Sequence, residues 1–495
     1  MAELLNHKEK LHKVQKELSD IIGLSTVAEE SHLPKLRYLD AVVKETLRLH
    51  PAVPLLLPRR PSQSCVVGGY TIPKHTTVFL NVWSIQRDPS LWDNPLEFNP
   101  ERFLNGTDQE WDFHGNNFQY APFGSGRRVC AGVALAERTL MYILASLLHS
   151  FEWRLPDGED VDMTEKLGLV LRKSTPLIAI PTPRLCCEGL PGNVQCLVHK
   201  DGAQSFEKNS SLATRATGLA HPWILAVLGN NLVHKFGELA DQYGPIYKLY
   251  LGNKLCVVVN SPSLVKEVVR DQDSIFANRD SNIAALAATY DGNDIAFSPH
   301  NSQWRAMRKV FVREVLSNSS LQASYDLRKD EVRKAIRDVY NDIGKPVHFG
   351  EEARRVGEEF QEVVIKLVDL LGKPNAADLF PVLAWFDIQG VKKEMEGYMQ
   401  SMDQIFEYVI AKCRKMTGGI KKEGKKDFLQ VMLELHEKED SEMSISVRQI
   451  KAVLVDIVAG GTDTTATTIE WAMAELLNNP KAMTYVQNEL SEVVD

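Results

Sequence analysis

Residues 122–132 read PFGSGRRVCAG, and the interpretation of the whole chain starts from this stretch. Cys130 lies between two glycine-containing turns and comes just before residues 132–150, whose spacing of apolar residues predicts a helix. A cysteine at the start of a helix meets free backbone N–H groups and the positive end of the helix dipole. Both effects favour the thiolate over the thiol, so we expect Cys130 to be a reactive or metal-binding residue.

The residues around the cysteine strengthen this expectation. Arg127 and Arg128 add positive charge beside it, and Gly124, Gly126 and Gly132 allow the backbone to bend and a flat molecule to lie against it. The alternative is a buried structural cysteine, which is the usual role of a lone one. The spacing of glycine and arginine is more elaborate than packing requires, and it therefore favours a binding site.

The stretch resembles the haem-binding signature of the cytochrome P450 family, Phe-x-x-Gly-x-Arg-x-Cys-x-Gly. The matching positions are Phe123, Gly126, Arg128, Cys130 and Gly132. The resemblance implies a haem b cofactor whose iron is bound by Cys130, with Arg128 paired to a haem propionate and Phe123 packed near the sulfur. A thiolate ligand pushes electron density onto the iron and favours O–O cleavage.

A second pair of motifs contains three charged residues. KETLRLHP places Glu45 and Arg48 three residues apart on one helix face, a pair that by itself is usually a solvated surface contact. FNPERF follows and contains Arg102. In the resembled family, residues at these positions form a buried network behind the haem, so we expect a structural role for them and not a catalytic one.

Three more residues are expected, by the same resemblance, to contact the haem propionates. Arg59 belongs to PLLLPRR, and Trp304 and Arg308 belong to NSQWRAMRKVF. The last two lie four residues apart, so both side chains can point at one partner. Without the resemblance, an ordinary amphipathic helix with one aromatic residue explains that segment better.

The segment IVAGGTDTTATTIEWAMAELL, residues 457–477, is the most informative for chemistry. Its glycines and threonines weaken regular helical hydrogen bonding and could open a local groove, with a kinked core helix as the alternative. It resembles the family's oxygen-binding helix, with Gly460 and Gly461 at a groove and Asp463 and Thr464 as an acid–alcohol pair. A carboxylate and a hydroxyl, with ordered water, can relay protons, which favours a true monooxygenase.

The order of these motifs is unusual. Residues 1–23 and 473–495 carry two versions of one phrase, beginning MAELLN. Residues 1–185 resemble the C-terminal part of the family and residues 229–495 its N-terminal part, joined by a linker at 186–228. The two versions look like paralogous copies, so a merged gene model, a tandem-gene fusion or a circular permutant would each explain the swapped order.

Composition and periodicity predict a mostly α protein with small β-sheets. The 495 residues are 44% apolar and 25% charged, with a net charge of −8 and no basic stripe, which argues against nucleic-acid binding. Seven scattered cysteines do not form a disulfide framework and indicate a reducing compartment. Four short strands are expected in VVGGYTI, TTVFLNV, IYKLYLG and KLCVVVN, the last two as a hairpin turning at Gly252-Asn253. Six long helical segments are predicted by a 3.6-residue period: 132–150, 325–343, 352–371, 391–415, 426–437 and 447–478.

The expected location is the cytosolic face of the endoplasmic reticulum membrane, by family resemblance. The sequence itself contains no recognisable targeting segment and no apolar stretch long enough to span a bilayer. Residues 186–228 stand where relatives have a membrane anchor and a proline-rich hinge, and they contain neither.

The resemblance therefore predicts a haem-thiolate monooxygenase that uses O2 and electrons from an NADPH-cytochrome P450 reductase. The substrate would be a small apolar plant metabolite, either a terpenoid or a phenolic such as a flavonoid. Substrate contacts are expected at Asn282–Ala296, Ala459, Val53–Leu57 and Gly168–Leu171. The alternative is a chimeric product that binds no haem, or binds it without turnover.

Overall fold

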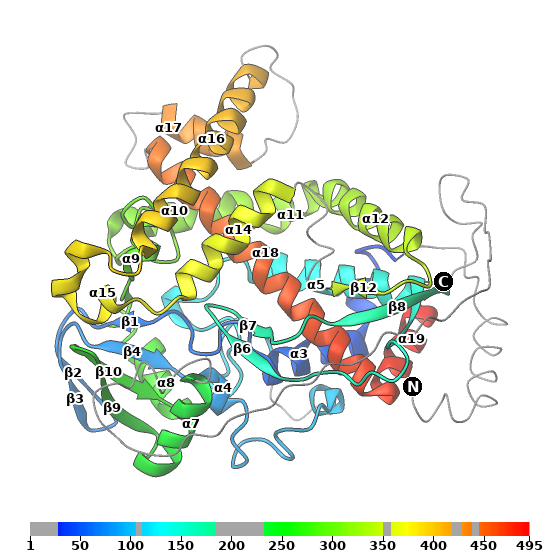
Figure 1. Cartoon of the computed structure of the whole chain (residues 1–495), viewed down its shortest axis with the longest axis horizontal. Coiled ribbons are helices and arrows are strands. Elements are labelled where there is room, and N and C mark those ends of the chain that lie inside the picture. Colours follow the sequence, from blue (N-terminus) through cyan, green and yellow to red (C-terminus); the bar gives the residue numbers. More distant parts are fainter. Residues whose placement is uncertain are drawn as a thin grey trace.

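The structure is a computed structural model that describes residues 28–104, 111–184, 232–349, 358–417, 428–437 and 445–494 (Figure 1). The predicted linker at 186–228 and the first copy of the repeated phrase, 1–23, lie outside these residues. The described part is mostly helical with small sheets, as predicted.

The long helices follow the predicted periods closely. The helix predicted at 447–478 is α18 and has those bounds, because Ser446 and Gln449 form a capping box at its start and Pro480 follows its C-cap, Asn479. The helices of eight or more residues are α3 (Arg37–Leu49), α5 (Val133–Ser150), α7 (Leu232–Tyr243), α10 (Ser302–Val310), α12 (Tyr325–Asn341), α14 (Glu358–Gly372), α16 (Val391–Thr417), α17 (Phe428–Glu437), α18 (Val447–Asn478) and α19 (Pro480–Val494). Shorter helices are α4 (Val82–Ile85), α8 (Pro262–Lys266), α9 (Ile283–Ala288), α11 (Asn318–Ala323) and α15 (Ala376–Leu379).

The largest sheet combines strands from both ends of the chain. Its order is β11 (Asn278–Arg279), β1 (Arg59–Arg60), β4 (Thr77–Leu80), β10 (Lys254–Val259) and β9 (Ile246–Leu251). Strands β4 and β10 are parallel, although they are separated by about 170 residues. The predicted hairpin is β9–β10, with Gly252 in the left-handed region at φ 60°. Pairing across this sheet joins residues 1–185 to residues 229–495.

The remaining strands form three small sheets. VVGGYTI is not one strand but part of the hairpin β2 (Cys65–Val67) and β3 (Tyr70–Ile72), because Gly68 and Gly69 both have positive φ and turn the chain. The others are β12 (Val347–His348), β8 (Ile178–Pro183) and β5 (Phe151–Arg154) in one sheet, and the hairpin β6 (Glu165–Leu167) and β7 (Leu171–Lys173).

Helix α18 runs through the molecule and contacts α3, α5, α14, α16, α17 and α19 (Figure 1). Its C-terminal half shares one hydrophobic cluster with α3, α5, α12 and α19, and Met473 and Leu476 are fully buried there. By contrast, Gly460 and Gly461 in its middle are exposed. Among the described residues, no helix combines the length and the apolar composition that crossing a bilayer requires.

Candidate functional site

The cysteine loop is shaped by glycines and by one backbone hydrogen bond. The Cys130 N–H donates to the Phe123 carbonyl at 2.9 Å, which closes the loop. Gly124 and Gly126 have φ of 74° and 70°, and a Cβ on Gly126 would lie 2.2 Å from the Val269 carbonyl oxygen. Only glycine fits position 126, and the Cys130 side chain remains exposed.

The local effect predicted for the helix start is present but is not the largest influence on the pKa of the Cys130 thiol. Cys130 has solvent-accessible surface but lies deep among protein atoms, and this desolvation raises its pKa more than the Gly132 N–H and the charge of Arg308 lower it. Gly132 is only the N-cap of α5, whose first residue is Val133. The exposed Cys130 sulfur can ligate a metal cation as a thiolate, and the Gly132 N–H and Arg308 stabilise its negative charge.

Four arginines interact electrostatically near this loop: Arg59 and Arg128 are buried, and Arg279 and Arg308 are half-buried. Burial lowers the pKa of Arg128 to about 9, and its positive neighbours Arg59 and Arg308 contribute. Burial together with Arg59, Arg128 and Arg308 also lowers the pKa of Arg279 well below its ordinary value. So much buried positive charge requires compensation by negative charge.

Few carboxylates among the described residues compensate the positive charge of these arginines. Arg59 donates to the Ser125 carbonyl at 2.9 Å, but its Nε and Nη1 are buried without a hydrogen-bond acceptor. Its nearest carboxylate belongs to Asp273, 3.8 Å from Nη1. The unpaired buried N–H groups of Arg59 suit a ligand that brings carboxylates, and the Cys130 thiol suits its metal, so the residues present fit the expected haem.

Three of the five N–H donors of the Arg128 guanidinium bind backbone carbonyls. Its Nε donates to the Ala277 carbonyl at 2.7 Å, its Nη1 to Ile295 at 3.0 Å and its Nη2 to Ser298 at 2.5 Å. Every guanidinium nitrogen therefore already has a backbone acceptor. Arg128 fastens the loop at 295–298 to the cysteine loop, and its guanidinium lies 4.0 Å from the centre of the Trp304 ring.

Trp304 and Arg308 both come from α10, as predicted. The Trp304 Nε1–H donates to the Ile295 carbonyl at 2.9 Å, and the ring is 3% exposed. Arg308 Nη2 donates to the carbonyl of Val129, directly before Cys130, at 2.5 Å. The structure thus brings both residues to the cysteine loop, where Arg308 lowers the pKa of Cys130.

The middle of α18 offers open space and an ion pair. A Cβ on Gly460 or Gly461 would meet no atom within 4 Å. Thr464 Oγ1 donates back to the Gly460 carbonyl at 2.7 Å, a bond that loosens the helix. Asp463 does not pair with Thr464 but with Arg172 of β7, where Nη2 and Oδ1 lie 2.8 Å apart.

Arg172 was not identified from the sequence. It also binds Asp369 of α14 at 2.6 Å, so it joins three elements that are far apart in the chain. Burial raises the pKa of Asp463, although the charge and hydrogen bond of Arg172 oppose this. No local pattern marks Arg172, because both of its partners lie about 200 or more residues away.

A pair of aspartates, the buried Asp294 and the half-buried Asp456, was also missed. Asp456 Oδ2 accepts from the Ile295 N–H at 2.6 Å, and Asp294 Oδ2 accepts from the Phe297 N–H at 2.8 Å. The two carboxyl groups hydrogen-bond to each other, and burial raises the pKa of both. Two carboxylates cannot share a hydrogen bond without a proton, so one proton is retained between them.

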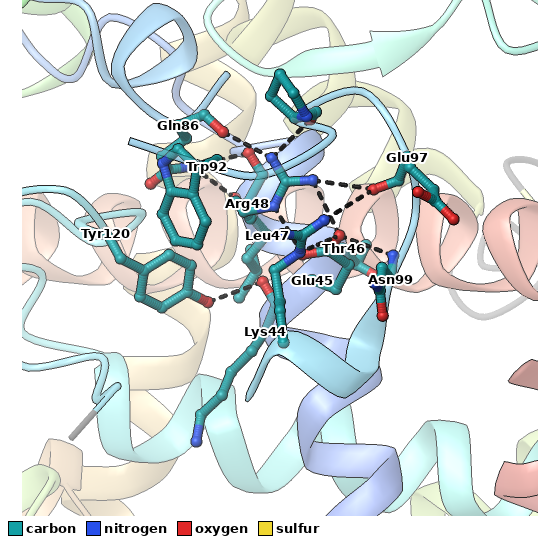
Figure 2. A network of polar contacts seen from close by, with 12 residues as sticks. Lys44, Glu45, Thr46, Leu47, Arg48, Gln86, Trp92, Glu97, Asn99 and Tyr120 are labelled. Atoms are coloured by element: carbon teal, nitrogen blue, oxygen red, sulfur yellow. Dashed lines mark hydrogen bonds and ion pairs between the residues drawn. The ribbon is translucent and has the colours of Figure 1, made fainter. Parts of the chain in front are cut away.

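The network behind the cysteine loop has the predicted members (Figure 2). Arg48 donates from Nε and Nη2 to the two Glu45 oxygens at 2.7 and 2.9 Å, and Arg102 Nε reaches Glu45 at 3.0 Å. The Glu45 and Arg48 side chains are fully buried. Arg48 also donates to the carbonyls of Gln86 and Pro95, so it ties α3 to the segment that follows α4.

The predicted substrate-contact segments meet in part. Ala52, Val170 and Val368 form a small buried cluster with Ala459 packed against it, and the Leu171 N–H donates to the Ala52 carbonyl at 2.9 Å. The turn at 168–171 and Ala459 of α18 are therefore neighbours, as predicted. Val368 of α14 joins them and was not predicted.

Comparison with known proteins places the chain in a family. The family model described as Cytochrome P450 matches residues 1–180 and 218–495. The chain is 50% identical over 189 residues to Flavonoid 3'-monooxygenase CYP75B137 of Crocosmia x crocosmiiflora, covering 37% of both chains. It is 47% identical over 186 residues to Flavonoid 3',5'-hydroxylase of Campanula medium, covering 37% of this chain and 36% of that one. It is 48% identical over 186 residues to Geraniol 8-hydroxylase of Swertia mussotii, covering 37% of both. Each match thus spans little more than a third of the relative's length.

Proposed function

Because the chain belongs to the cytochrome P450 family, we propose that it is a haem-thiolate monooxygenase acting on a small apolar plant metabolite. The observation that carries the proposal is the exposed Cys130 thiol together with the buried Arg59, whose Nε and Nη1 lack acceptors. Haem b, when bound, supplies the redox chemistry that activates O2 with electrons from a reductase.

The residues of the proximal side have distinct roles in this proposal. Cys130 would hold the iron, with Gly126 and Phe123 shaping its loop. Arg59, with two unpaired nitrogens, is the best-placed partner for a propionate, and Arg308 stands beside the sulfur. Arg128 positions the surrounding loops through three backbone carbonyls, and its two remaining N–H donors would be available to a propionate.

The residues of α18 would handle protons. Thr464 Oγ1 carries a proton that it now donates to Gly460, and rotation of this hydroxyl would redirect it toward the open side of the helix. Asp463 is held by Arg172, so this ion pair must loosen before the Asp463 carboxyl can exchange a proton with Thr464 or water. The exposed Gly460 and Gly461 leave room there for oxygen and water.

The substrate class is supported by the relatives and by the apolar cluster near Ala459. Two of the similar proteins are named for flavonoids and one for geraniol, a terpenoid. We propose a flavonoid-like phenolic or a terpenoid as substrate, an NADPH-cytochrome P450 reductase as partner, and the cytosolic face of the endoplasmic reticulum as the location.

The swapped order of motifs belongs to the same proposal. We propose that residues 1–185 and 229–495 are the C-terminal and N-terminal parts of one P450 fold, joined by a linker at 186–228. The shared five-stranded sheet and the cluster common to α5 and α18 support a single folded unit.

The test uses the purified, haem-reconstituted chain and two variants. We expect the wild type to give the carbon monoxide difference band of a thiolate-bound haem and Cys130→Ala to lose it. Thr464→Ala should keep the band but divert about tenfold more of the consumed NADPH to peroxide, since a relay group contributes on the order of 10²-fold or more. Absence of the band in the wild type would favour the chimeric alternative. Unchanged coupling in Thr464→Ala would remove Thr464 from the relay.

A further inference from the structure

Helix α19 fills a slot formed by α3 and α5. It contacts both helices, and seven of its residues are buried. These are Ala482, Met483, Val486, Gln487, Leu490, Ser491 and Val494. The apolar members belong to the same hydrophobic cluster as α3 and α5, so the slot recognises one face of this helix.

Glu489 gives the slot its main polar contact. Its carboxylate accepts from the Tyr38 N–H at 2.5 Å and from the Leu39 N–H at 2.8 Å, in the first turn of α3. The N-cap residue of α3, Leu36, has no side chain that can cap the helix. Glu489 therefore supplies, from another element, the acceptor that these N–H groups need.

Three further polar contacts involve the same region of the chain. Gln487 donates to Glu152 at 3.2 Å, and Ser491 accepts from Arg184 at 3.3 Å. At the end of α18, Glu475 lies 2.7 Å from the His50 ring nitrogen Nε2. Each contact uses a side chain of residues 473–495 and a partner from residues 1–185.

The first copy of the repeated phrase retains all of these contact residues. Adding 472 to its residue numbers aligns residues 1–23 with 473–495, and the four polar residues are identical. They are Glu3, Gln15, Glu17 and Ser19, aligned with Glu475, Gln487, Glu489 and Ser491. Among the buried apolar positions, Val14 and Leu18 are identical, while Leu11 and Ile22 replace Met483 and Val494 conservatively.

The differences gather on the face that α19 exposes. Lys13 is aligned with Tyr485, which is 56% exposed, and Glu9 and Asp20 are aligned with the exposed Lys481 and Glu492. The one buried position that differs in character is 482, an alanine aligned with Lys10. Substitution has therefore preserved the docking face and varied the solvent face.

We propose that residues 1–23 of the same chain are a second occupant of the α3–α5 slot and exchange there with residues 473–495. Residues 24–27 join this first copy to Ala28, which is buried in the cluster that also contains Val494. Such a short connection keeps the local concentration of the first copy high. The second copy is the major occupant, because Lys10 would bury a charge where Ala482 buries a methyl group. The proposal does not rest on haem binding or on turnover.

The test compares Glu17→Ala, Glu489→Ala and the double variant in the full-length chain by amide hydrogen exchange. Glu489→Ala should speed exchange in residues 480–494 but leave the Tyr38 and Leu39 amides protected, because Glu17 takes over the cap. The double variant should lose roughly fivefold or more protection at these amides, the scale of a lost helix cap. Glu17→Ala alone should change little.

A second variant tests the exchange without weakening the slot. Lys10→Ala removes the one unfavourable side chain of the first copy, so that copy should compete better for the slot. The amides of residues 480–494 should then exchange hydrogen faster, although none of these residues has changed. Lys13→Ala, aligned with exposed Tyr485, is the matched control and should have no effect. Equal loss of protection in Glu489→Ala and the double variant, together with no response to Lys10→Ala, would overturn the proposal. Dimers of Glu489→Ala in light scattering would also overturn it, by assigning the slot to another chain's residues 1–23.

Discussion

At the scale of single residues, Asp294 and Asp456 together fix the backbone of the loop at 295–297. Asp456 fixes the Ile295 N–H, and the Ile295 carbonyl accepts from both Arg128 and Trp304. Asp294 Oδ1 is buried without any donor if both carboxyls are ionised. A proton on Asp456 satisfies that oxygen, so one shared proton stabilises the loop that holds Arg128.

We therefore expect Asp456→Asn and Asp456→Ala to differ. The amide can still donate to Asp294 and should cost less than about 1 kcal/mol of unfolding free energy, whereas alanine leaves Asp294 unpaired and should cost about 2–3 kcal/mol. The raised pKa of Asp456 means that the folded state retains this proton. The contribution of this proton to the free energy of unfolding is present at acidic pH and is lost as the pH rises through the folded-state pKa of Asp456. Urea unfolding at pH 6 and pH 9 measures both effects, and equal stability of the two variants would contradict this role.

At the scale of elements, Glu165 of β6 joins four separate segments. One carboxylate oxygen lies 2.9 Å from Arg87 Nη2 and 3.3 Å from His50 Nδ1, and the other lies 3.2 Å from Trp83 Nε1 and 3.2 Å from His234 Nε2. The His50 ring stacks on Trp471 of α18, with ring centres 3.8 Å apart. These contacts hold α3, α4, α7 and α18 around the β6–β7 hairpin.

This network predicts an acid-sensitive contribution to stability. Burial alone would raise the pKa of Glu165, but hydrogen bonds from His234 and His50 and the charge of Arg87 together lower it far below its ordinary value. Because the pKa of Glu165 is lower in the folded state, its ionised carboxylate stabilises the fold at pH values above the unfolded-state pKa, which is near 4.3. This stabilisation is lost as the pH falls toward the folded-state pKa.

Glu165→Gln should therefore cost about 2 kcal/mol at pH 7 and lose stability less steeply than the wild type between pH 5 and pH 3. Thermal unfolding across this range provides the measurement, with the exposed Glu159→Gln as the matched control. Parallel curves for the wild type and Glu165→Gln would show that the network does not respond to acid.

At the scale of the whole molecule, the two ends of the sequence share both sheet and core. Strand β4 pairs with β10, and α5 packs against α12 and α18. Partly buried salt bridges cross between the parts as well: Arg328 binds Glu30 at 2.6 Å, and Arg172 binds Asp463 at 2.8 Å. Contacts of this extent make the covalent connection at 186–228 dispensable once the protein has folded.

We expect a chain with a protease site inserted in 186–228, cut after folding, to elute as one species in gel filtration. Its thermal unfolding should remain a single transition within a few degrees of the uncut protein, because the apolar surface between the parts stays buried. The uncut chain with the same insertion is the control. Separation of the two fragments without denaturant would show that the shared sheet and core do not hold the parts together.

The sequence by itself determined the features that depend on neighbouring residues. The turns of the Cys130 loop, the bounds of α18 and the β9–β10 hairpin follow from local glycines, caps and periodicity, and the Glu45–Arg48 pair follows from helix geometry. Such patterns can be recognised because their partners lie within a few residues of one another.

Only the tertiary structure decided the properties that depend on distant partners. Desolvation raises the pKa of Cys130 against the local helix effect, and Arg128 donates to three carbonyls nearly 150 or more residues away. Asp463 pairs with Arg172 instead of Thr464, and Asp456 meets Asp294. Desolvation and ion pairing act through space, so the packing of distant residues sets their strength and sign. The spacing of residues in the sequence does not contain this information.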